Sequence, residues 1–422
     1  MEQLLGAYIS VPFCRAKCSY CNFASGVLGA GASGAGARGD GASGADWMER
    51  YVERVCAEIR SARARAAELQ AQLPGRMDTV YFGGGTPSLL NAEQMRRIFA
   101  ALGGEFEVTA DAEITIECAP GQLGDETLDE LLRLGMNRVS FGVQSFVDAE
   151  ARAVGRMHTR EICLAEIERM HAAGVEEINI DLIAGLPRQT LASWRESVDV
   201  ALGSGVPHVS VYMLEVDEDS RLGRELLAHG TRYGAELVAT EDEVAERYAA
   251  ACEWLEANGV MQYEISNFAR KGHASRHNIK YWRREPYVGF GLDAHSMLRC
   301  GDGAVRWGNT DDLGRYEGLR FEVQGSRFEG PEVERIGAER GFEEAMFLGL
   351  RMNEGVDLQA LGVEFGAELM RGAVAALSDV EEAGLVEREG SWLRLTARGR
   401  MVSNEVFSRL LVVSCKEGNG DD

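Results

Sequence analysis

Runs of β-branched residues alternate with longer amphipathic segments through the first half of the chain, and this alternation restricts the fold more than any other feature. We expect strands at residues 4–11, 79–82, 113–117, 138–144, 177–183 and 208–214. We expect helices between them at residues 47–73, 92–102, 126–134, 161–173 and 191–202. Strands and helices in this order build parallel sheets, because each helix crosses back over the sheet. The sequence therefore predicts an α/β fold, a partial (β/α)6 barrel of the TIM-like type, over residues 1–225.

The remaining half of the chain changes character. We expect a helix at 240–258 and a strand at 262–268, within a barrel extension that covers residues 226–330. Further helices are expected at 342–351, 369–383 and 397–411, and strands at 385–388 and 392–395. Helices that lead into a two-stranded hairpin are typical of a winged-helix module. We therefore predict a C-terminal α+β domain of this kind over residues 331–422.

One segment, residues 26–46, consists almost entirely of Gly, Ala and Ser. It has too little apolar surface to offset the conformational entropy of an ordered chain. We expect a flexible loop insertion with no function of its own.

Charge and cysteine content restrict the function classes. The 422 residues include 44 Lys plus Arg and 67 Asp plus Glu, a formal net charge of −23. This balance disfavours a nucleic-acid partner, which attracts basic surfaces. Nine cysteines are too few for a disulfide scaffold, and no run of about 18 apolar residues or secretory signal is evident. We expect a cytoplasmic protein with no membrane span.

Three of the nine cysteines, Cys14, Cys18 and Cys21, follow the first expected strand with the spacing C-x3-C-x2-C. Structural zinc sites use four protein ligands, and Cys56 is the nearest further cysteine. A 4Fe–4S cluster held by three thiolates leaves one iron open for a ligand that is not protein. This spacing therefore favours an iron–sulfur site.

Other strand ends carry groups suited to a ligand. Gly83, Gly84 and Gly85, followed by Thr86, end the second strand, and glycine lets the backbone approach a ligand closely. Glu117, Gln144 and Asp181 lie at or near the ends of later strands in apolar surroundings. Polar groups in such positions are costly unless they are partnered. Each could be a satisfied core residue, but together at one barrel mouth they favour a ligand site.

These motifs together resemble the radical S-adenosylmethionine (SAM) superfamily, and in particular its branch of proteins similar to oxygen-independent coproporphyrinogen III oxidase. The resemblance implies a 4Fe–4S cluster on Cys14, Cys18 and Cys21, with SAM chelating the open iron. It also implies contacts to SAM from Tyr8, Tyr20, Gly84, Gly85, Thr86, Glu117, Gln144, Arg156 and Asp181. Arg156 would pair with the carboxylate of SAM.

Two groups of proteins within this branch are possible matches for the chain. The oxidases carry a fourth cysteine, C-x3-C-x2-C-x-C, and a long preceding segment, whereas this chain has Phe23 at that position and its first cluster cysteine at Cys14. Both departures favour the haem chaperones of the HemW group, which also carry H-N-x-x-Y-W. Here that motif occupies residues 277–282. The resemblance thus implies haem, or another tetrapyrrole, as cargo.

His277 of this motif is a candidate axial ligand of haem iron, with His295 and His158 as further candidates. Tyr281 and Trp282 could border a porphyrin face; alternatively, His277 caps a helix and the aromatic residues belong to the core. The basic residues around the motif would suit the two haem propionates, unless they are a solvated face: Arg270, Lys271, Arg276, Lys280, Arg283 and Arg284. Residues 289–294 fit G-x-G-x-x-A, but without a surrounding βαβ unit we discount a dinucleotide site.

The first functional hypothesis is a haem chaperone that delivers haem to an apo-haemoprotein, such as a membrane haemoprotein of a respiratory chain contacted peripherally, without coproporphyrinogen oxidase activity. The alternative is the oxidase itself, which decarboxylates propionates through a 5′-deoxyadenosyl radical. A third hypothesis is another radical SAM tetrapyrrole enzyme, for instance one that opens haem.

Overall fold

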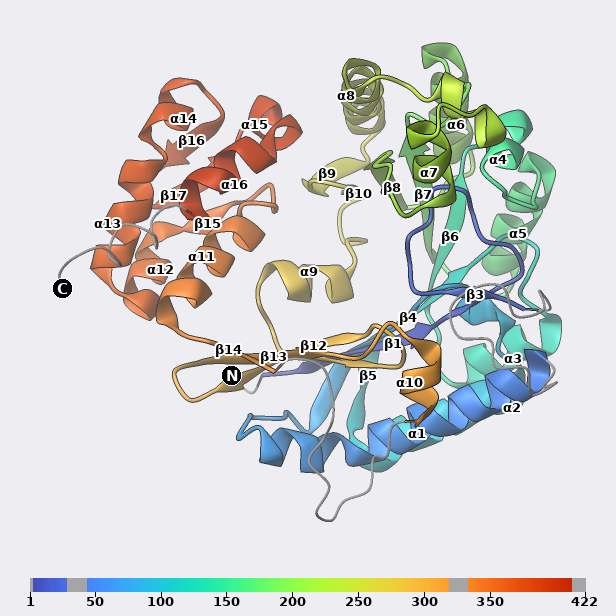
Figure 1. Cartoon of the computed structure of the whole chain (residues 1–422). Coiled ribbons are helices and arrows are strands. Elements are labelled where there is room, and N and C mark those ends of the chain that lie inside the picture. The colour runs from blue at the N-terminus through green and yellow to red at the C-terminus, as the bar shows by residue number, and fades with distance from the viewer. Residues whose placement is uncertain (1–2, 29–43, 319–332, 412–422) are drawn as a thin grey trace.

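A computed structural model describes residues 3–28, 44–318 and 333–411 (Figure 1). Within these residues a 12-stranded sheet has the order β14-β13-β12-β11-β1-β4-β5-β6-β7-β8-β10-β9. Its two terminal strands do not pair with each other, so the sheet is open. The predicted α/β class with a mostly parallel central sheet is confirmed.

The six expected strands form the centre of this sheet, and they are parallel neighbours in chain order. They are β1 (Leu5–Val11), β4 (Arg76–Gly84), β5 (Glu107–Cys118), β6 (Arg138–Gln144), β7 (Glu177–Ala184) and β8 (His208–Met213). The helices of this part are α1 (Gly44–Glu68), α2 (Ala92–Glu105), α3 (Asp125–Arg133), α4 (Asp148–Ala153), α5 (Arg160–Ala172), α6 (Leu191–Gly203) and α7 (Arg221–Leu227), with η1 (Pro87–Leu89) and η2 (Arg232–Leu237). The carboxyl ends of the parallel strands therefore meet at one edge, as the alternation predicts.

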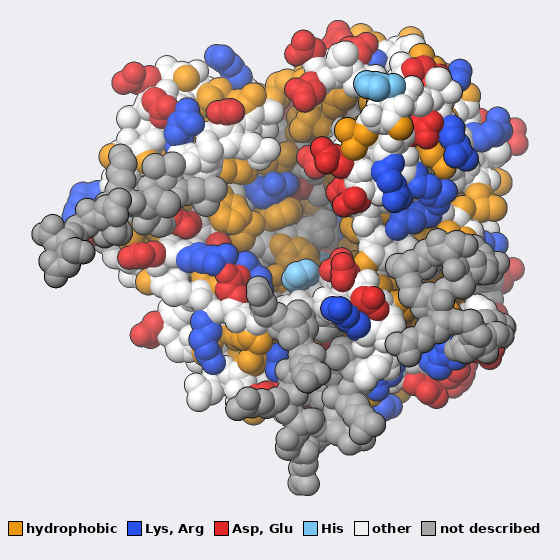
Figure 2. All heavy atoms as spheres, in the orientation of Figure 1, with side chains coloured by type: hydrophobic (Ala, Val, Ile, Leu, Met, Phe, Trp, Pro, Cys, Tyr) orange, Lys and Arg blue, Asp and Glu red, His pale blue; other side chains and the backbone are white. Residues whose placement is uncertain are grey.

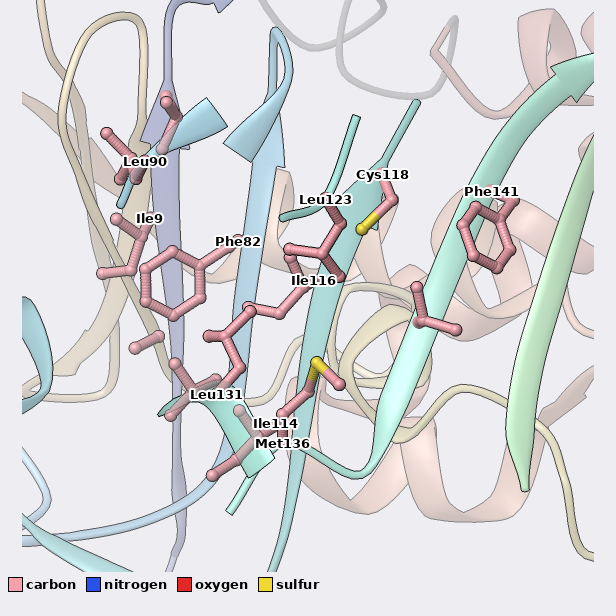
Figure 3. Packing of buried hydrophobic residues seen from close by; sticks show 14 of the residues in the cluster. Ile9, Phe82, Leu90, Ile114, Ile116, Cys118, Leu123, Leu131, Met136 and Phe141 are labelled. Atoms are coloured by element: carbon pink, nitrogen blue, oxygen red, sulfur yellow. The ribbon is translucent and has the colours of Figure 1, made fainter. Parts of the chain in front are cut away.

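The two faces of the central strands differ in chemistry. One face carries residues such as Ile9, Phe82, Ile116 and Phe141, which are buried in the main hydrophobic core (Figure 3). Side chains alternate across a strand, so the intervening residues share the opposite face. That face carries Tyr8, Tyr81, Thr115, Glu117, Ser140, Asn179, Asp181, Ser210 and Tyr212. We call this polar face of the central strands the inner face.

Residues after β8 extend the sheet at both edges. On one side β10 (Asn267–Ala269) pairs antiparallel with β8 and with β9 (Met261–Glu264), after helix α8 (Glu241–Ala257). On the other side β11 (Tyr287–Phe290) pairs parallel with β1. The sheet then continues through β12 (His295–Cys300), β13 (Gly303–Gly308) and β14 (Glu334–Ile336), with α10 (Leu313–Gly318) after β13. Helix α9 (Arg276–Trp282) links the two edges.

The C-terminal domain has a hydrophobic core of its own, which includes Met346, Leu350 and Leu393. It contains the sheet β15-β17-β16, formed by β15 (Val356–Asp357), β17 (Trp392–Leu395) and β16 (Val386–Glu389). Its helices are α11 (Ala338–Gly349), α12 (Leu358–Phe365), α13 (Ala367–Ala376), α14 (Ser378–Glu382), α15 (Ala397–Met401) and α16 (Ser403–Leu411).

Three expected helix bounds were wrong. The helix expected at 369–383 is divided at Leu377, and the one expected at 397–411 is divided at Val402, whose φ of −121° and ψ of 35° are not helical. The second break lets α15 contact β17 while α16 contacts α11, which one straight helix would not do. Helix α1 ends at Glu68 rather than at 73, because the chain turns and Gln72 joins the backbone of Arg299.

The ends of the Gly/Ala-rich segment are regular, whereas we expected a loop over all of 26–46. Strand β3 (Gly26–Val27) pairs parallel with β2 (Phe13–Cys14), and residues from Gly44 onward begin α1. The rest of the segment lies outside the described residues. Among the helices that the structure describes, none is long and apolar enough to cross a membrane.

Candidate functional site

The three cysteines of the C-x3-C-x2-C motif lie on one loop directly after β1. Cys14 ends the short strand β2, and the backbone N–H of Cys21 donates to the carbonyl of Cys18 at 3.4 Å. The Lys17 ammonium closes the loop by donating to the Phe23 carbonyl at 3.0 Å. The loop is thus held at the carboxyl edge of the sheet, where parallel-barrel sites gather.

Donor groups point at two of the thiols. The Thr86 hydroxyl lies 3.7 Å from Cys14 Sγ, and Arg156 Nη1 lies 3.4 Å from Cys18 Sγ. Burial raises the pKa of Cys14 and of Cys21, so nearby donors and a positive charge matter for thiolate formation. In the parts of the chain that the structure describes, no three His, Cys, Asp or Glu side chains gather around the position of one metal ion.

Steric constraints explain the three glycines at the end of β4. Gly84 has a φ of 101°, and its N–H bonds the Glu117 carboxylate. A Cβ on Gly85 would lie 2.7 Å from the Phe13 carbonyl oxygen, and one on Gly83 would lie 2.9 Å from the Tyr8 ring. Only glycine lets this turn pass so close to the cysteine loop and the inner face.

Two carboxyl groups lie on the inner face beside these glycines. Glu117 accepts a hydrogen bond from the Tyr81 hydroxyl at 2.9 Å, and Asp181 accepts from Asn179 at 2.8 Å and from the Ser140 hydroxyl at 3.1 Å. Burial, and then the charge of Asp181, raises the pKa of Glu117 to about 8. Burial also raises the pKa of Asp181. A cationic or hydrogen-bonding ligand on this face would therefore favour the ionised form of both carboxyl groups.

Three further residues that the resemblance assigns to SAM binding lie near these carboxyl groups: Tyr8, Arg156 and Gln144. Tyr8 stacks against Tyr81 with ring centroids 6.0 Å apart. Arg156, besides its contact to Cys18, donates to the Gly142 carbonyl, but its Nε is buried without a hydrogen-bond partner. Gln144 has a φ of 69° and a buried Oε1 that is likewise unpartnered. Unsatisfied buried polar atoms are unusual in folded proteins and fit the binding of a polar ligand.

Tyr20 stands somewhat apart from the carboxylates. It packs beside the small apolar group of Val154, Ile183 and Leu186, and it interacts electrostatically with Cys18 and Arg156. It therefore borders the cysteine loop rather than the inner face around Glu117.

His277 lies at the same site, deeply buried on α9. Its Nδ1 is 2.8 Å from the Thr79 hydroxyl and its Nε2 is 2.8 Å from the Tyr281 hydroxyl. Its ring centroid lies 5.1 Å from that of Tyr81. Burial, followed by the charge of Lys280, lowers the pKa of His277 to about 3, so the ring is neutral. A metal could use Nε2 only after the contact with Tyr281 opened. The helix cap is Ser275, not His277.

The two other histidine candidates differ from His277 and from each other. His158 is buried, with Nε2 3.0 Å from the Val143 carbonyl oxygen, and burial lowers its pKa to about 4. His295 is 61% exposed at the side chain, and its Nε2 is 3.9 Å from Asp293. Only His295 presents an open imidazole.

Several of the basic residues around the motif are paired within the protein, and their expected role in binding haem propionates stays a prediction. Lys280 is buried between Asp78 at 2.8 Å and Glu285 at 3.0 Å. Arg283 binds Glu354 at 2.8 Å, and Arg284 is buried near Glu344 at 3.6 Å. Arg276 donates to the carbonyls of Asp78 and Asp111. These residues hold α9 in place. Lys271 is exposed, and Arg270 contacts the Asn258 carbonyl.

Sequence reasoning missed several inner-face residues. Asn179 donates to Ser140 and Ser210 and lies 2.5 Å from His208 Nδ1, while Tyr81 positions Glu117. A signal for this face was present in the sequence. In β5 and in β7 a polar residue, Thr115 or Asn179, occurs two positions before the expected site residue, and this spacing indicates a polar face.

Comparison with known proteins agrees with these observations. The model of the radical SAM superfamily matches residues 8–201, and that of the HemN C-terminal domain matches residues 339–402. "Heme chaperone HemW" of Bacillus subtilis (strain 168) is 32% identical over 406 residues, which cover 96% of this chain and 98% of that protein. This chain belongs to the radical SAM superfamily, in its HemW-like branch. A relative of the same description from Synechocystis is 36% identical over 352 residues, covering 83% of this chain and 78% of that protein.

Among solved structures, the coproporphyrinogen III oxidase (HemN) of Escherichia coli, a radical SAM enzyme, matches with a TM-score of 0.78 and 22% identity. The match covers 97% of this chain and 90% of that one, and it shows a shared fold. Proteins of this superfamily use a 4Fe–4S cluster and SAM. The residues described above fit that pair, because three thiols, two unpartnered polar atoms and two carboxyl groups surround one space.

Proposed function

We propose that this protein is a haem chaperone that holds a 4Fe–4S cluster and SAM, binds haem and delivers it to an apo-haemoprotein. The observation that carries the proposal is the position of the H-N-x-x-Y-W helix. His277, near the start of this helix, stacks against the ring of Tyr81, which bonds Glu117. The chain that carries this motif is similar over nearly its whole length to proteins named heme chaperone HemW.

Each group of residues has a role in this proposal. Cys14, Cys18 and Cys21 would hold the cluster, and Arg156 and Thr86 would stabilise their thiolates. Tyr8, Tyr20, Gly84, Gly85, Glu117, Gln144 and Asp181 would hold SAM. When both are bound, they supply one-electron chemistry that can split the sulfonium of SAM.

Haem titration of the reconstituted protein under anaerobic conditions tests the binding half of the proposal. We expect a Soret band that saturates at a stoichiometric ratio, and transfer of haem to an added apo-haemoprotein, followed by the shift of that band. If no stable haem complex forms, the proposal is wrong.

The fold also favours a second candidate, coproporphyrinogen III oxidase, because that enzyme shares the whole architecture. Against it, the fourth-cysteine position is Phe23, whose side chain is 62% exposed. Incubation of the reconstituted protein with SAM, reductant and coproporphyrinogen III distinguishes the two. We expect no protoporphyrinogen; its formation would replace the chaperone proposal with the oxidase.

A haem chaperone of this kind would act in the cytoplasm and would contact haemoproteins at a membrane surface. Fractionation of cells that produce the tagged protein tests this directly. A protein found outside the cytoplasm and the membrane surface would contradict this part of the proposal.

A further inference from the structure

His295, the first residue of β12, is the most exposed of the three histidine candidates. Its side chain is 61% exposed, and Asp293 Oδ1 lies 3.9 Å from its Nε2, which is beyond hydrogen-bond distance. Neither ring nitrogen forms a hydrogen bond with a residue that the structure describes. His277 and His158, in contrast, are buried and have ring nitrogens engaged with other groups of the protein. The imidazole of His295 is therefore available to a ligand.

The strand register places His295 beside the inner face. Gly289 of β11 is the register partner of Tyr8 of β1, so the two residues share the inner side of the sheet. A Cβ on Gly289 would collide with the carbonyl oxygen of His295, so the backbone of His295 lies directly over this glycine. Burial raises the pKa of Tyr8 most, and the charge of Asp293 is among the further causes, so this carboxylate also lies near Tyr8.

The turn before His295 is held firmly, while the ring itself has room. The backbone N–H groups of Gly291 and Leu292 donate to a carboxylate and a hydroxyl of α1, at 2.9 and 2.8 Å. Gly308 of β13 is the register partner of His295, and a Cβ there would lie 2.7 Å from the ring. A ligating side chain on such a support keeps a defined position.

The surroundings of the inner face suit a large aromatic macrocycle. Figure 2 shows a hollow between the C-terminal domain and the barrel, with hydrophobic side chains in it. Tyrosines that are not fully buried lie on or beside the inner face: Tyr8, Tyr81, Tyr212, Tyr281 and Tyr287. Such rings pack against other aromatic systems by stacking and by edge contacts. A carboxylate beside a ligating imidazole, as Asp293 would be, increases the basicity of the ligand.

Resting on the proposed function, we infer that His295 is the axial protein ligand of the iron in the haem cargo. A nitrogen of the neutral imidazole donates its lone pair to the iron. His277 of the H-N-x-x-Y-W motif supports the site instead, because its ring nitrogens are engaged with the hydroxyls of Thr79 and Tyr281. Haem therefore binds at the edge of the inner face next to Tyr8, and the buried contacts of α9 stay closed.

Anaerobic haem titrations of the full-length reconstituted protein, followed by visible absorption and by EPR of the ferric state, test this inference. His295→Gly removes the ligand, and His295→Tyr replaces the imidazole by a phenol. His229→Gly is the matched control, because His229 is also exposed and lies just after α7. His277→Gln tests the motif histidine. Only variants that keep the cluster iron and the melting temperature of the wild type are compared.

We expect His295→Gly to weaken haem binding by about tenfold and to change both the Soret position and the EPR signal of the ferric iron. Added imidazole should restore the wild-type spectrum, because the free base can enter the space that the side chain has left. His295→Tyr should show the spectrum of a haem with a tyrosine ligand. His229→Gly and His277→Gln should keep the wild-type spectrum.

Two results would overturn the inference: a wild-type spectrum in His295→Gly, whatever its affinity, or a loss of the imidazole signature in His277→Gln. If His295→Gly binds haem too weakly for a spectrum, recovery of binding with imidazole supports the inference and a lack of recovery contradicts it. In all these cases the wild type still binds haem, so the chaperone proposal survives. A wild-type protein that binds no haem overturns the proposed function first, and this inference with it.

Discussion

At the scale of single residues, the cysteine loop shows which thiols can carry chemistry. Cys14, Cys18 and Cys21 lie together, with donors from Thr86 and Arg156. Cys56, Cys118 and Cys163 are buried, as is usual for a free cysteine that acts as a small hydrophobic residue. Cys252 and Cys300 are partly exposed, and Cys415 lies outside the described residues.

The first prediction concerns Cys18, the buried thiol next to Arg156. Cys18→Ala should abolish the visible absorbance of the reconstituted cluster and remove its iron, because a cluster needs its thiolate ligands. Iron assay and the visible spectrum measure this. Cys300→Ala, outside the loop, is the control and should keep both. Unchanged iron in Cys18→Ala would refute the cluster site.

The second prediction concerns the protonation of Glu117. Its pKa is about 8 in the folded chain and about 4.3 in the unfolded chain. Between these two pH values the folded chain keeps a proton on Glu117 that the unfolded chain has released. Stability therefore falls as the pH rises from about 4.3 to 8, by up to about 1.4 kcal/mol per unit. Glu117→Gln is neutral throughout and should lose this component.

Denaturant unfolding without SAM, at several values between pH 5 and 8, measures the difference between wild type and Glu117→Gln. Other groups, such as Glu58 with a pKa of about 7, titrate in both proteins and cancel. Glu107→Gln on the exposed part of the same strand is the control. Parallel stability curves for wild type and Glu117→Gln would contradict the raised pKa.

At the scale of elements, helix α9 depends on a carboxylate from the sheet. Glu113 of β5 accepts backbone N–H bonds from Arg276 at 3.0 Å and His277 at 2.9 Å, at the amino end of the helix. A negative charge at this end also complements the helix dipole. The motif helix is thus attached to the barrel through its first turn.

The third prediction follows from this attachment. Glu113→Ala should lower the free energy of unfolding by about 2–3 kcal/mol, because it leaves the backbone N–H groups of Arg276 and His277 without their acceptor. It should also weaken haem binding, since α9 would lose its position. Chemical denaturation and the haem titration measure both. Glu107→Ala, in a surface pair with Arg76, should change stability by less than about 0.5 kcal/mol; a similar loss in both variants would speak against this role.

At the scale of the whole molecule, two hydrophobic cores share one chain. The main core lies between the parallel sheet and its helices, and the second lies within the C-terminal domain. Side-chain contacts such as Arg283 with Glu354 and Asn353 with Gln262 connect the two parts. The cysteine loop and the C-terminal domain therefore belong to separately packed units.

The fourth prediction uses this division. Leu393 is fully buried in the second core, so Leu393→Ala should destabilise the C-terminal domain by about 2–5 kcal/mol. The cluster, held by the first unit, should keep its absorbance at temperatures where the domain has begun to unfold. Circular dichroism and cluster absorbance, recorded together during heating, test this; Arg394→Ala serves as a surface control. Simultaneous loss of both signals at the lower temperature would show that the units unfold as one.

Much of the barrel could be predicted, because its strands and helices each carry a local pattern. All six strands were located, although β5 begins at Glu107 rather than at 113. The cysteine motif and the GGGTP turn are each contiguous in sequence. The breaks at Leu377 and Val402 could not be predicted, since they depend on what the adjoining helices pack against.

The sequence by itself determined the parallel α/β architecture, the cysteine loop and the family, because these follow from periodicity and from short motifs whose residues are close along the chain. The tertiary structure alone decided which charges are available to a ligand. Lys280 pairs with Asp78 and Arg284 lies near Glu344, both from distant segments. Arg351, far from any motif, lies on Trp282 and forms no ion pair with the residues that the structure describes. Pairing of charges depends on distance in space, and the sequence does not record which chain segments the fold brings together.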